Sequence, residues 1–305
     1  MRQSHGEKMT AQGTSDSTDQ STDRQPLPAG LYVVATPIGN LGDITLRALD
    51  TLRGADLIAC EDTRVTAKLL ARHAITAPTT AYHDHNAARV RPKLLARIAD
   101  GGVVALVSDA GTPLVSDPGY RLVAEARQRG LAVTALPGAS ALLAALAVAG
   151  LPTDRFVFLG FLPPKTAARR KMIEHYAGVP ASLVIYESAG RLPATLADLA
   201  HVLGDRPAAV CRELTKRFEE VACDPLPALA DRYAAAGPPK GEIVVVVGPP
   251  AERVADVDEV DRALTAALRT LSVREAAAAV AYATGARRRD VYQRALALAK
   301  ADKDG

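Results

Sequence analysis

The chain has 305 residues, of which 48% are hydrophobic and 23% charged, and its formal net charge is +3. This is the composition of a soluble globular protein, and the length allows two or three domains. The small net charge does not indicate a nucleic-acid partner, although local clusters of Lys and Arg can still contact phosphate. The three cysteines lack C-x-x-C spacing, which argues against a disulfide framework or a zinc ribbon and fits a reducing cytoplasm. The longest apolar stretch, 141–149, is too short to span a bilayer.

Residues 1–29 are rich in Ser, Thr, Gln and Asp and contain no apolar run. We therefore expect a disordered tail there, and neither a signal peptide nor part of a core.

Residues 30–150 and 151–250 each alternate short apolar runs with helical stretches, and a Gly-Leu-Pro segment at 150–155 looks like a hinge between them. This alternation is typical of α/β domains, and for the first one we expect a mostly parallel sheet covered on both faces. The predicted strands are 31–35, 57–60, 103–107 and 132–136 in the first domain, and 156–159, 182–186, 208–212 and 243–247 in the second.

Residues 257–301 change to Ala, Arg and Leu at helical spacing and predict a small all-helical module. Ser272 and Glu275 form a capping-box pattern at one helix start, and Gly285 is a predicted helix end. The order helix, Gly turn, helix indicates a helix-turn-helix whose second helix, opening at 287–289, can contact nucleic acid. The alternative is a solvated basic helix end.

Two loops follow predicted strands and combine Gly, Pro and Asp. The sequence VSDAGTPLVSDPG, residues 107–119, follows one strand, and the segment 31–49 repeats the same order of apolar strand, Pro-Gly turn, acidic residue and helix. Such loops offer backbone groups and short polar side chains in a nearly fixed shape, so we expect one shared pocket for a small polar ligand. The alternative is two tight strand-to-helix turns. Neither loop matches a Rossmann or P-loop motif.

Several segments resemble one family in collinear order over about residues 30–300. They are TPIGNLGDIT (36–45), CEDTR (60–64), HDHN (83–86), VSDAGTPLVSDPGY (107–120), LPGASA (136–141), LPTDRFVFLGFLP (151–163), YES (186–188), RELTKRFEE (212–220) and KGEIVVVV (240–247). The family is ribosomal RNA small subunit methyltransferase I, in the tetrapyrrole methylase superfamily. The resemblance implies S-adenosylmethionine-dependent 2′-O-methylation of a cytidine in the decoding region of 16S ribosomal RNA in the small subunit. It also implies a homodimer.

The family fold has two α/β domains with the cofactor in the cleft between them. By resemblance, the cofactor-binding residues are Pro37, Gly39, Asp43, Ser108, Asp109, Ala110, Gly111, Thr112, Pro137, Gly138, Ala139, Ser140 and Gly248. One departure is visible, because family members commonly carry His-Arg shortly after Tyr-Glu-Ser. Here Ala189 and Gly190 follow Ser188, so the histidine is missing, while Arg191 retains the positive charge of the arginine.

A ribose 2′-hydroxyl is a poor nucleophile, and a nearby base can help by taking its proton. Glu61 and Asp62 at the end of the second strand are candidates, because ligands of open α/β sheets bind at strand ends. His83 is the third candidate. The alternatives are a helix N-cap at Asp62 or Thr63 and hydrogen bonding within the loop at His83. His83 and His85 form an H-x-H pattern without further ligands nearby, so we expect no metal.

Basic residues could neutralise RNA phosphates. The candidates for substrate contact are Arg64, His85, Lys165, Arg169, Arg191, Arg212, Lys216 and Arg288. The alternatives for the cations are surface ion pairs and solvated helix faces. Rival functions are methylation of a small macrocycle or of a protein, as in diphthine formation, and a non-catalytic ribosome-assembly factor.

Overall fold

The computed structural model describes residues 26–116, 119–251 and 256–304. The predicted N-terminal tail therefore lies mostly outside the described residues, as do residues 117 and 118 of the second loop. None of the described helices is long and apolar enough to cross a membrane.

The first sheet is parallel throughout, in the order β3-β2-β4-β1-β5. Its strands are β1 (Gly30–Val34), β2 (Leu57–Cys60), β3 (Thr79–Ala81), β4 (Val103–Val107) and β5 (Val133–Leu136). The prediction of a parallel sheet is confirmed. Val34 is in register with Val107 on one side and Leu136 on the other, so β1, β4 and β5 end at the same edge.

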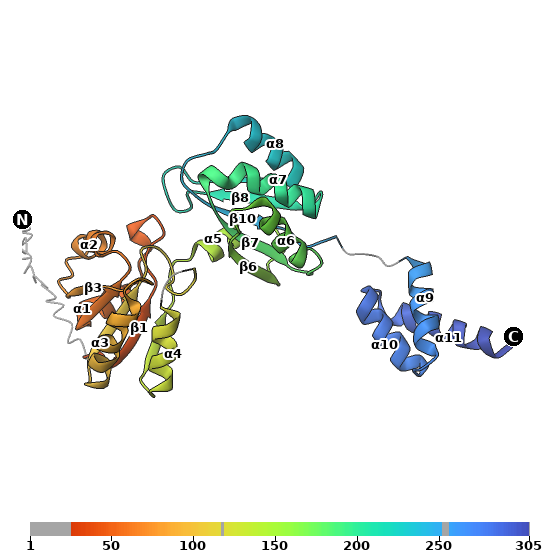
Figure 1. The fold of residues 1–305 in the computed structure, drawn as a ribbon, viewed down its shortest axis with the longest axis horizontal. Helices are drawn as coiled ribbons and strands as arrows, with labels where there is room; N and C mark the ends of the chain where they lie inside the picture. Colours follow the sequence, from red (N-terminus) through yellow and green to blue (C-terminus); the bar gives the residue numbers. More distant parts are fainter. Residues whose placement is uncertain (1–25, 117–118, 252–255, 305) are drawn as a thin grey trace, which may run out of the picture.

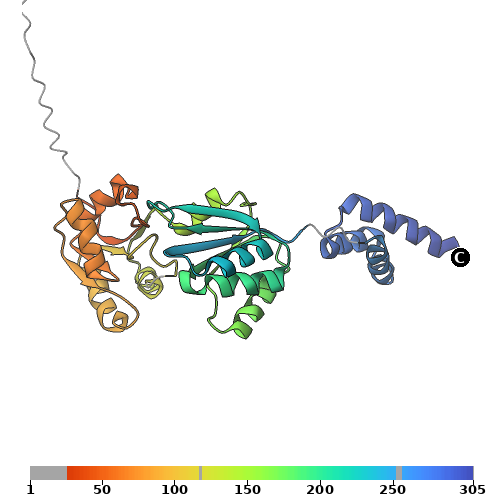
Figure 2. The ribbon, with the colours of Figure 1, turned by 90° about the horizontal axis from the view of Figure 1, so that it is seen from above.

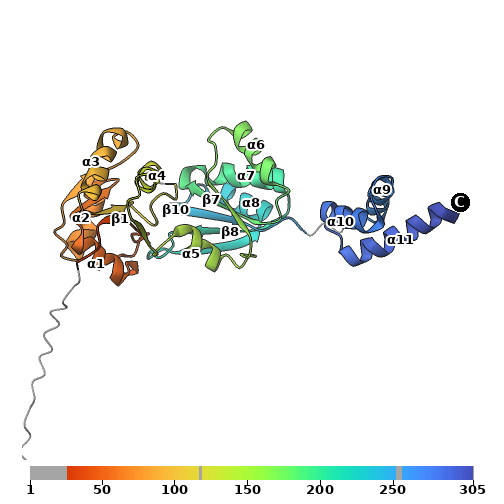
Figure 3. The same cartoon turned by 90° about the horizontal axis from the view of Figure 1, so that it is seen from below.

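Helices cover both faces of this sheet. Leu52 of α1 (Leu46–Gly54) and Leu70 of α2 (Thr63–Arg72) pack on one face, and Leu95 of α3 (Ala87–Ala99) and Leu122 of α4 (Tyr120–Gln128) pack on the other. Figure 3 shows α1 on one side of β1, with α3 and α4 on the opposite side. A short 3-10 helix, η1 (Leu41–Asp43), follows β1.

The second sheet is mixed, in the order β6-β7-β10-β8-β9. Its strands are β6 (Phe156–Phe161), β7 (Ser182–Ser188), β8 (Pro207–Arg212), β9 (Glu220–Pro225) and β10 (Glu242–Val247). Only β6 and β7 are parallel, and every other pairing is antiparallel. The antiparallel direction of β10 brings its beginning, and not its end, to the edge where β7 and β8 finish.

The helices of this half lie on the two faces of the second sheet. α6 (Thr166–Tyr176), α7 (Leu192–Leu203) and α8 (Leu226–Ala236) pack on one face, and a 3-10 turn, η2 (Ala189–Arg191), precedes α7. α5 (Ala141–Val148), which is apolar on all sides, packs on the other face, against Val244 and Val246. The chain therefore crosses from one sheet to the other ahead of α5, at 137–140, and the domain limits given above stay predictions.

The C-terminal helices are α9 (Val257–Leu268), α10 (Val273–Thr284) and α11 (Arg288–Asp304). The predicted capping box between Ser272 and Glu275 is confirmed, and Gly285 ends α10 with φ +70°. The helices share a small core that includes Leu264, Val280 and Val291, and they lie apart from both sheets (Figures 1 and 2). The predicted fold class, two α/β sheets with covering helices plus a helical module, is confirmed.

Candidate active site

Three loops meet where β1, β4 and β5 end. Thr36 and Gly111 exchange backbone hydrogen bonds of 2.9 and 3.0 Å. The Thr36 hydroxyl donates to the Ser108 carbonyl at 3.1 Å, and the Thr112 hydroxyl donates to the Ala139 carbonyl at 3.2 Å. The loops that the sequence predicts to share a pocket are thus tied together, because their strands end side by side.

Two glycines allow this close approach. Gly111 has φ +81°, a conformation that residues with a Cβ rarely adopt. A Cβ added to Gly138 would lie 2.8 Å from the Cβ of Ala35 at the end of the neighbouring strand. A residue with a Cβ would strain the backbone at position 111 and would collide with Ala35 at position 138.

A cavity of about 450 Å³ lies between these loops and the second sheet. The predicted cofactor residues that line it are Asp109, Ala110, Gly111, Thr112 and Ser140. The opposite wall is formed by the ends of β6, β7 and β8 and by the beginning of β10, and includes Phe161, Tyr186, Glu187, Leu214 and Ile243. One wall therefore offers backbone and short polar groups, and the other offers mostly apolar surface.

Aromatic rings form part of the apolar wall. The Tyr186 ring packs edge-to-face against Phe158 and Phe161, with centroid separations of 4.8 and 5.8 Å. The Tyr186 hydroxyl accepts a hydrogen bond of 3.2 Å from the backbone N–H of Leu142 in α5. Tyr186 therefore links its strand to α5 beside the cavity, while Phe161 stays 57% exposed.

The remaining predicted cofactor residues lie outside the cavity lining. Ser108 and Ala139 accept the hydrogen bonds that hold the loops together. Pro37 is buried beside the lining residue Ile38, and Pro137 precedes Gly138 in the third loop. Gly39 contacts the aliphatic stem of Lys216, whose Cγ would lie 2.5 Å from a Cβ at this position. Asp43 is exposed in η1.

Gly248, another predicted cofactor residue, lies away from this cavity. It follows the end of β10, and its N–H donates to the Pro207 carbonyl at 2.8 Å, whereas the cavity is lined by the beginning of that strand up to Val244. Four residues of strand separate the two places by about 13 Å. The expectation came from the family resemblance alone, and the antiparallel direction of β10 places its beginning at the cavity.

Acidic side chains gather at the ends of β2 and β4. Asp109 accepts a hydrogen bond of 3.0 Å from the Asp62 N–H, which brings the two loops together. Burial raises the pKa of Glu61, and the charges of Asp109 and Asp84 raise it further, while His83 opposes them. A carboxylate whose pKa is raised holds a proton more strongly, so Glu61 is a stronger base than an ordinary glutamate.

Asp62 has a different role from Glu61. It is the N-cap of α2, where its side chain accepts from the Arg64 N–H at 2.8 Å. The Arg64 guanidinium also donates to it, with a shortest distance of 2.6 Å, and these hydrogen bonds lower the pKa of Asp62 to about 2. A carboxylate that is so weakly basic is unsuited to proton abstraction, so the capping alternative holds for Asp62.

The two histidines lie next to the acidic cluster. The rings of His83 and His85 are 6.0 Å apart in an edge-to-face arrangement. The backbone N–H of His83 donates to Asn86, and the buried His83 Nδ1 has no hydrogen-bond partner among the described residues. His85 is exposed in the loop just before α3. Within the described part of the chain, no group of three or more His, Cys, Asp or Glu side chains could hold a metal ion.

Several cations predicted to contact substrate are held by carboxylates instead. Arg169 is 3% exposed and pairs with Asp198 at 2.6 Å, so its prediction as an RNA contact is corrected to a buried ion pair. Ion pairs also join Arg64 to Asp62, Arg191 to Glu187, Arg212 to Glu220, and Lys216 to both Glu213 and Glu242. Asp198 and Glu242 are distant in the sequence from the cations that they pair with, whereas the other partners lie within eight residues, and the sequence alone does not show which neighbouring carboxylates form pairs.

The two remaining predicted cations are exposed and have no ion pair within the described ranges. Lys165 precedes α6. Arg288 lines a shallow hollow of about 520 Å³ with Arg274, Arg289 and Tyr292. The helical module thus gathers three arginines and one tyrosine on one surface.

Comparison with known proteins assigns the chain to a family. A family model described as Tetrapyrrole (Corrin/Porphyrin) Methylases matches residues 30–230, and one described as RsmI C-terminal HTH domain matches residues 254–299. Ribosomal RNA small subunit methyltransferase I of Mesorhizobium japonicum is 51% identical over 282 residues, which cover 92% of this chain and 96% of the relative. The chain belongs to the ribosomal RNA small subunit methyltransferase I family. The member from Erythrobacter litoralis is 53% identical and covers 90% of this chain and 97% of its own.

Solved structures share the fold of this family at lower identity. A conserved hypothetical protein from Aeropyrum pernix K1 superposes with a TM-score of 0.57 and 21% identity, covering 90% of this chain and 98% of its own. Uroporphyrin-III C-methyltransferase from Thermus thermophilus, in complex with S-adenosyl homocysteine, superposes with a TM-score of 0.51 and 22% identity, covering 72% and 97%. The methyltransferase I family therefore carries the tetrapyrrole methylase fold plus a C-terminal helical module.

Sequence analysis missed the apolar wall of the candidate site. Ile243 begins a predicted strand, and Phe161 lies just beyond the predicted strand 156–159, in the part of β6 that the prediction left out. Nothing in these patterns indicates which strand ends face the first sheet. The motif YES at 186–188 was the available signal, because Tyr186, Glu187 and Ser188 all line the cavity.

Proposed function

We propose that the chain transfers the methyl group of S-adenosylmethionine to the 2′-hydroxyl of a cytidine in 16S ribosomal RNA. The observation that carries the proposal is the cavity between the three joined loops and the second sheet, whose lining residue Asp109 connects it to the acidic cluster. It occurs in a chain whose relatives at 51% and 53% identity are named ribosomal RNA small subunit methyltransferase I.

The cavity fits S-adenosylmethionine in size and chemistry. Its volume of about 450 Å³ lies in the range of small-molecule sites. The backbone of Gly111 and Thr112 and the carboxylate of Asp109 suit the polar amino-acid part of the cofactor, while Phe161 and Ile243 suit a flat ring. When bound, S-adenosylmethionine supplies an electrophilic methyl group on a sulfonium.

Glu61 is our candidate for the group that takes the proton of the acceptor hydroxyl. The raised pKa makes its carboxylate a better base than an ordinary glutamate. His83 lies beside it and is a second candidate through its unpartnered Nδ1. Most of the acceleration comes from alignment of the acceptor with the cofactor in a cavity that excludes water.

The helical module supplies one RNA-binding surface in this proposal. Arg274, Arg288 and Arg289 can contact phosphates, and Tyr292, which is 41% exposed, can stack on an unpaired base. We further propose that the chain acts in the cytoplasm as a homodimer on the small ribosomal subunit.

The experiment incubates the protein with labelled S-adenosylmethionine and small ribosomal subunits from a strain that lacks its own enzyme. Nucleosides are then separated and identified by mass spectrometry. We expect 2′-O-methylcytidine as the labelled product. Absence of transfer, with cofactor binding shown separately by calorimetry, would reject RNA as the acceptor and favour a macrocycle or a protein.

A further inference from the structure

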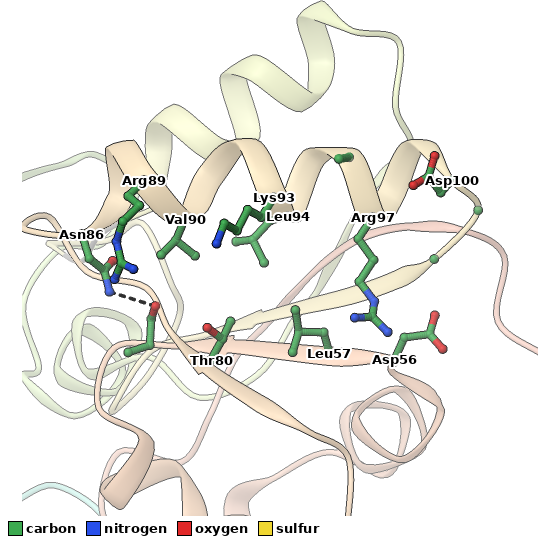
Figure 4. A pocket seen from close by; sticks show the side chains of 14 residues that line it. Asp56, Leu57, Thr80, Asn86, Arg89, Val90, Lys93, Leu94, Arg97 and Asp100 are labelled. Carbon is green, nitrogen blue, oxygen red and sulfur yellow. Dashed lines mark hydrogen bonds between the residues drawn. The ribbon is translucent and has the colours of Figure 1, made fainter.

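A second hollow lies outside the candidate active site. It has a volume of about 980 Å³ and runs between α3 and the edge of the first sheet at β2 and β3 (Figure 4). We call it the α3 groove. Leu57, Val90 and Leu94 contribute apolar surface, and Thr80 contributes a hydroxyl. Nothing in the proposed transfer reaction uses this groove.

Three cations line the α3 groove at regular spacing. Arg89, Lys93 and Arg97 are four residues apart, so they lie on one side of α3 at intervals of about 6 Å. This is close to the separation of neighbouring phosphates along an RNA strand. All three side chains are exposed, and none has an ion pair within the described ranges of the chain. They differ in this from Arg191, Arg212 and Lys216, whose charges are already neutralised.

Helix stability does not explain Arg89 and Lys93, whereas Arg97 lies in the last turn of α3, where the helix dipole favours a cation. Like charges four residues apart on a helix repel one another and weaken it. Three such charges on one side of α3 repel one another in the isolated protein. A bound polyanion would relieve that repulsion. The groove therefore shows charge complementarity to phosphate.

The two ends of the groove are different. One end lies at Asn86, whose side chain donates to the Ala81 carbonyl at 3.0 Å. Asn86 is three residues after His83 of the candidate active site. At the other end lie the carboxylates of Asp56 and Asp100. Figure 4 shows Arg89 beside Asn86, Lys93 over the middle, and Arg97 pointing toward Asp56. The positively charged part of the groove thus begins at Arg89, next to the candidate active site. Its net positive charge falls toward Arg97, where Asp56 and Asp100 lie.

We propose that the α3 groove binds the single-stranded RNA that flanks the methylated nucleotide, with Arg89 and Lys93 each contacting a phosphate. This inference rests on the proposed function and names a part of the substrate surface that the function requires. Thr80 can add a hydrogen bond to the strand. Arg97 contributes less, because two carboxylates lie near it.

The test compares two double variants that remove the same charge. Arg89→Gln/Lys93→Gln changes the groove, and Arg47→Gln/Lys68→Gln is the matched control on α1 and α2, which cover the opposite face of the sheet. Arg47 and Lys68 are exposed and have no ion pair among the described residues. Affinity for small ribosomal subunits is measured over a range of salt concentrations.

We expect the groove variant to bind subunits roughly tenfold more weakly than the wild type at moderate salt. The slope of log affinity against log salt should fall by about 1.4, the value for two lost single-strand phosphate contacts. The control variant should differ by less than about twofold, since its side chains make no phosphate contact in this proposal. S-adenosylhomocysteine affinity and melting temperature should not fall in either variant.

Two outcomes would overturn the proposal for the groove and leave the proposed function standing. One is equal subunit affinity and equal salt slope in both double variants, with the wild type active. The other is a groove variant that binds RNA normally but changes from dimer to monomer in light scattering, which would make the groove a contact between copies. A wild-type protein that neither binds nor methylates subunits would overturn the proposed function together with the groove.

Discussion

Thr36 and Gly111 exchange two backbone hydrogen bonds, of 2.9 and 3.0 Å, although they are far apart in the sequence. The pair joins the loop after β1 to the loop after β4, and Thr112 extends the connection to the loop after β5. Loops that are fixed in this way lose little entropy when a ligand binds. The polar wall of the cavity is therefore formed before the cofactor arrives.

Gly138→Ala should destabilise the protein and weaken cofactor binding. The added Cβ would lie 2.8 Å from that of Ala35, so the third loop must move, at a cost of about 1–3 kcal/mol. Gly178→Ala is the matched control, because nothing lies within 4 Å of a Cβ there. Urea unfolding and calorimetry with S-adenosylhomocysteine measure the two effects. Equal stability and equal affinity in both variants would show that the loop tolerates the methyl group.

Asp62→Asn should leave methyl transfer close to the wild-type rate. Asparagine is a good N-cap and keeps an oxygen for the Arg64 N–H, whereas Asp62→Ala removes the cap and should lower the melting temperature. Comparison of transfer rates and melting curves separates the two roles. A loss of transfer in the asparagine variant at unchanged stability would restore Asp62 as a base.

Asp109→Asn should shift the acid limb of the pH profile to lower pH. The negative charge of Asp109 helps raise the pKa of Glu61, and transfer requires ionised Glu61, so activity rises with pH through that pKa. Asparagine keeps an acceptor for the Asp62 N–H but removes the charge. Asp84→Asn should give a smaller shift in the same direction, and Asp100→Asn, outside the cluster, should give none. The measurement is kcat/KM for RNA against pH at saturating cofactor. If the acid limb stays at the same pH in Asp109→Asn, ionisation of Glu61 does not determine that limb.

Arg169→Gln should cost stability and leave the RNA affinity of the folded protein unchanged. Its side chain is buried against Asp198, which keeps its ion pair with Arg170 when Arg169 is replaced, so the expected cost is that of lost buried hydrogen bonds, about 1–3 kcal/mol. Lys171→Gln, on the exposed side of α6, should change the free energy of unfolding by less than about 0.5 kcal/mol. Denaturant unfolding and subunit binding test this. Weaker RNA binding at unchanged stability would return Arg169 to the substrate surface.

The sequence predicts the first sheet better than the second. β4 reads VVALV and is buried throughout, so its apolar run is unmistakable, whereas β3 has only three residues, Thr79–Ala81, and was missed. β9, with the sequence EVACDP, was missed because it mixes charged and apolar residues. Strand direction in the second sheet could not be read from the sequence, so the resemblance alone could not show which end of β10 lies at the cavity. The loops at Ser108 and Gly138 could be predicted because their glycines and prolines mark the ends of apolar runs.

The cations show a second limit of sequence reasoning. Arg191 and Arg212 lie in segments that resemble the family, and their carboxylate partners Glu187 and Glu220 are nearby in the sequence, but only the folded chain shows that they form ion pairs. Arg89 and Lys93 carry no motif, and their significance comes from the hollow beside α3. A charge on a helix becomes a candidate contact only when the structure shows that no carboxylate neutralises it.

The most direct test of the central claim is single-turnover methyl transfer by Glu61→Gln on small ribosomal subunits, together with calorimetry of S-adenosylhomocysteine. Glutamine keeps the shape of Glu61 but cannot take a proton. We predict a cofactor affinity within about twofold of the wild type, and transfer slowed roughly 10²- to 10⁴-fold, the usual contribution of a positioned base. Transfer at the wild-type rate would contradict the assignment of Glu61 as the group that accepts the proton.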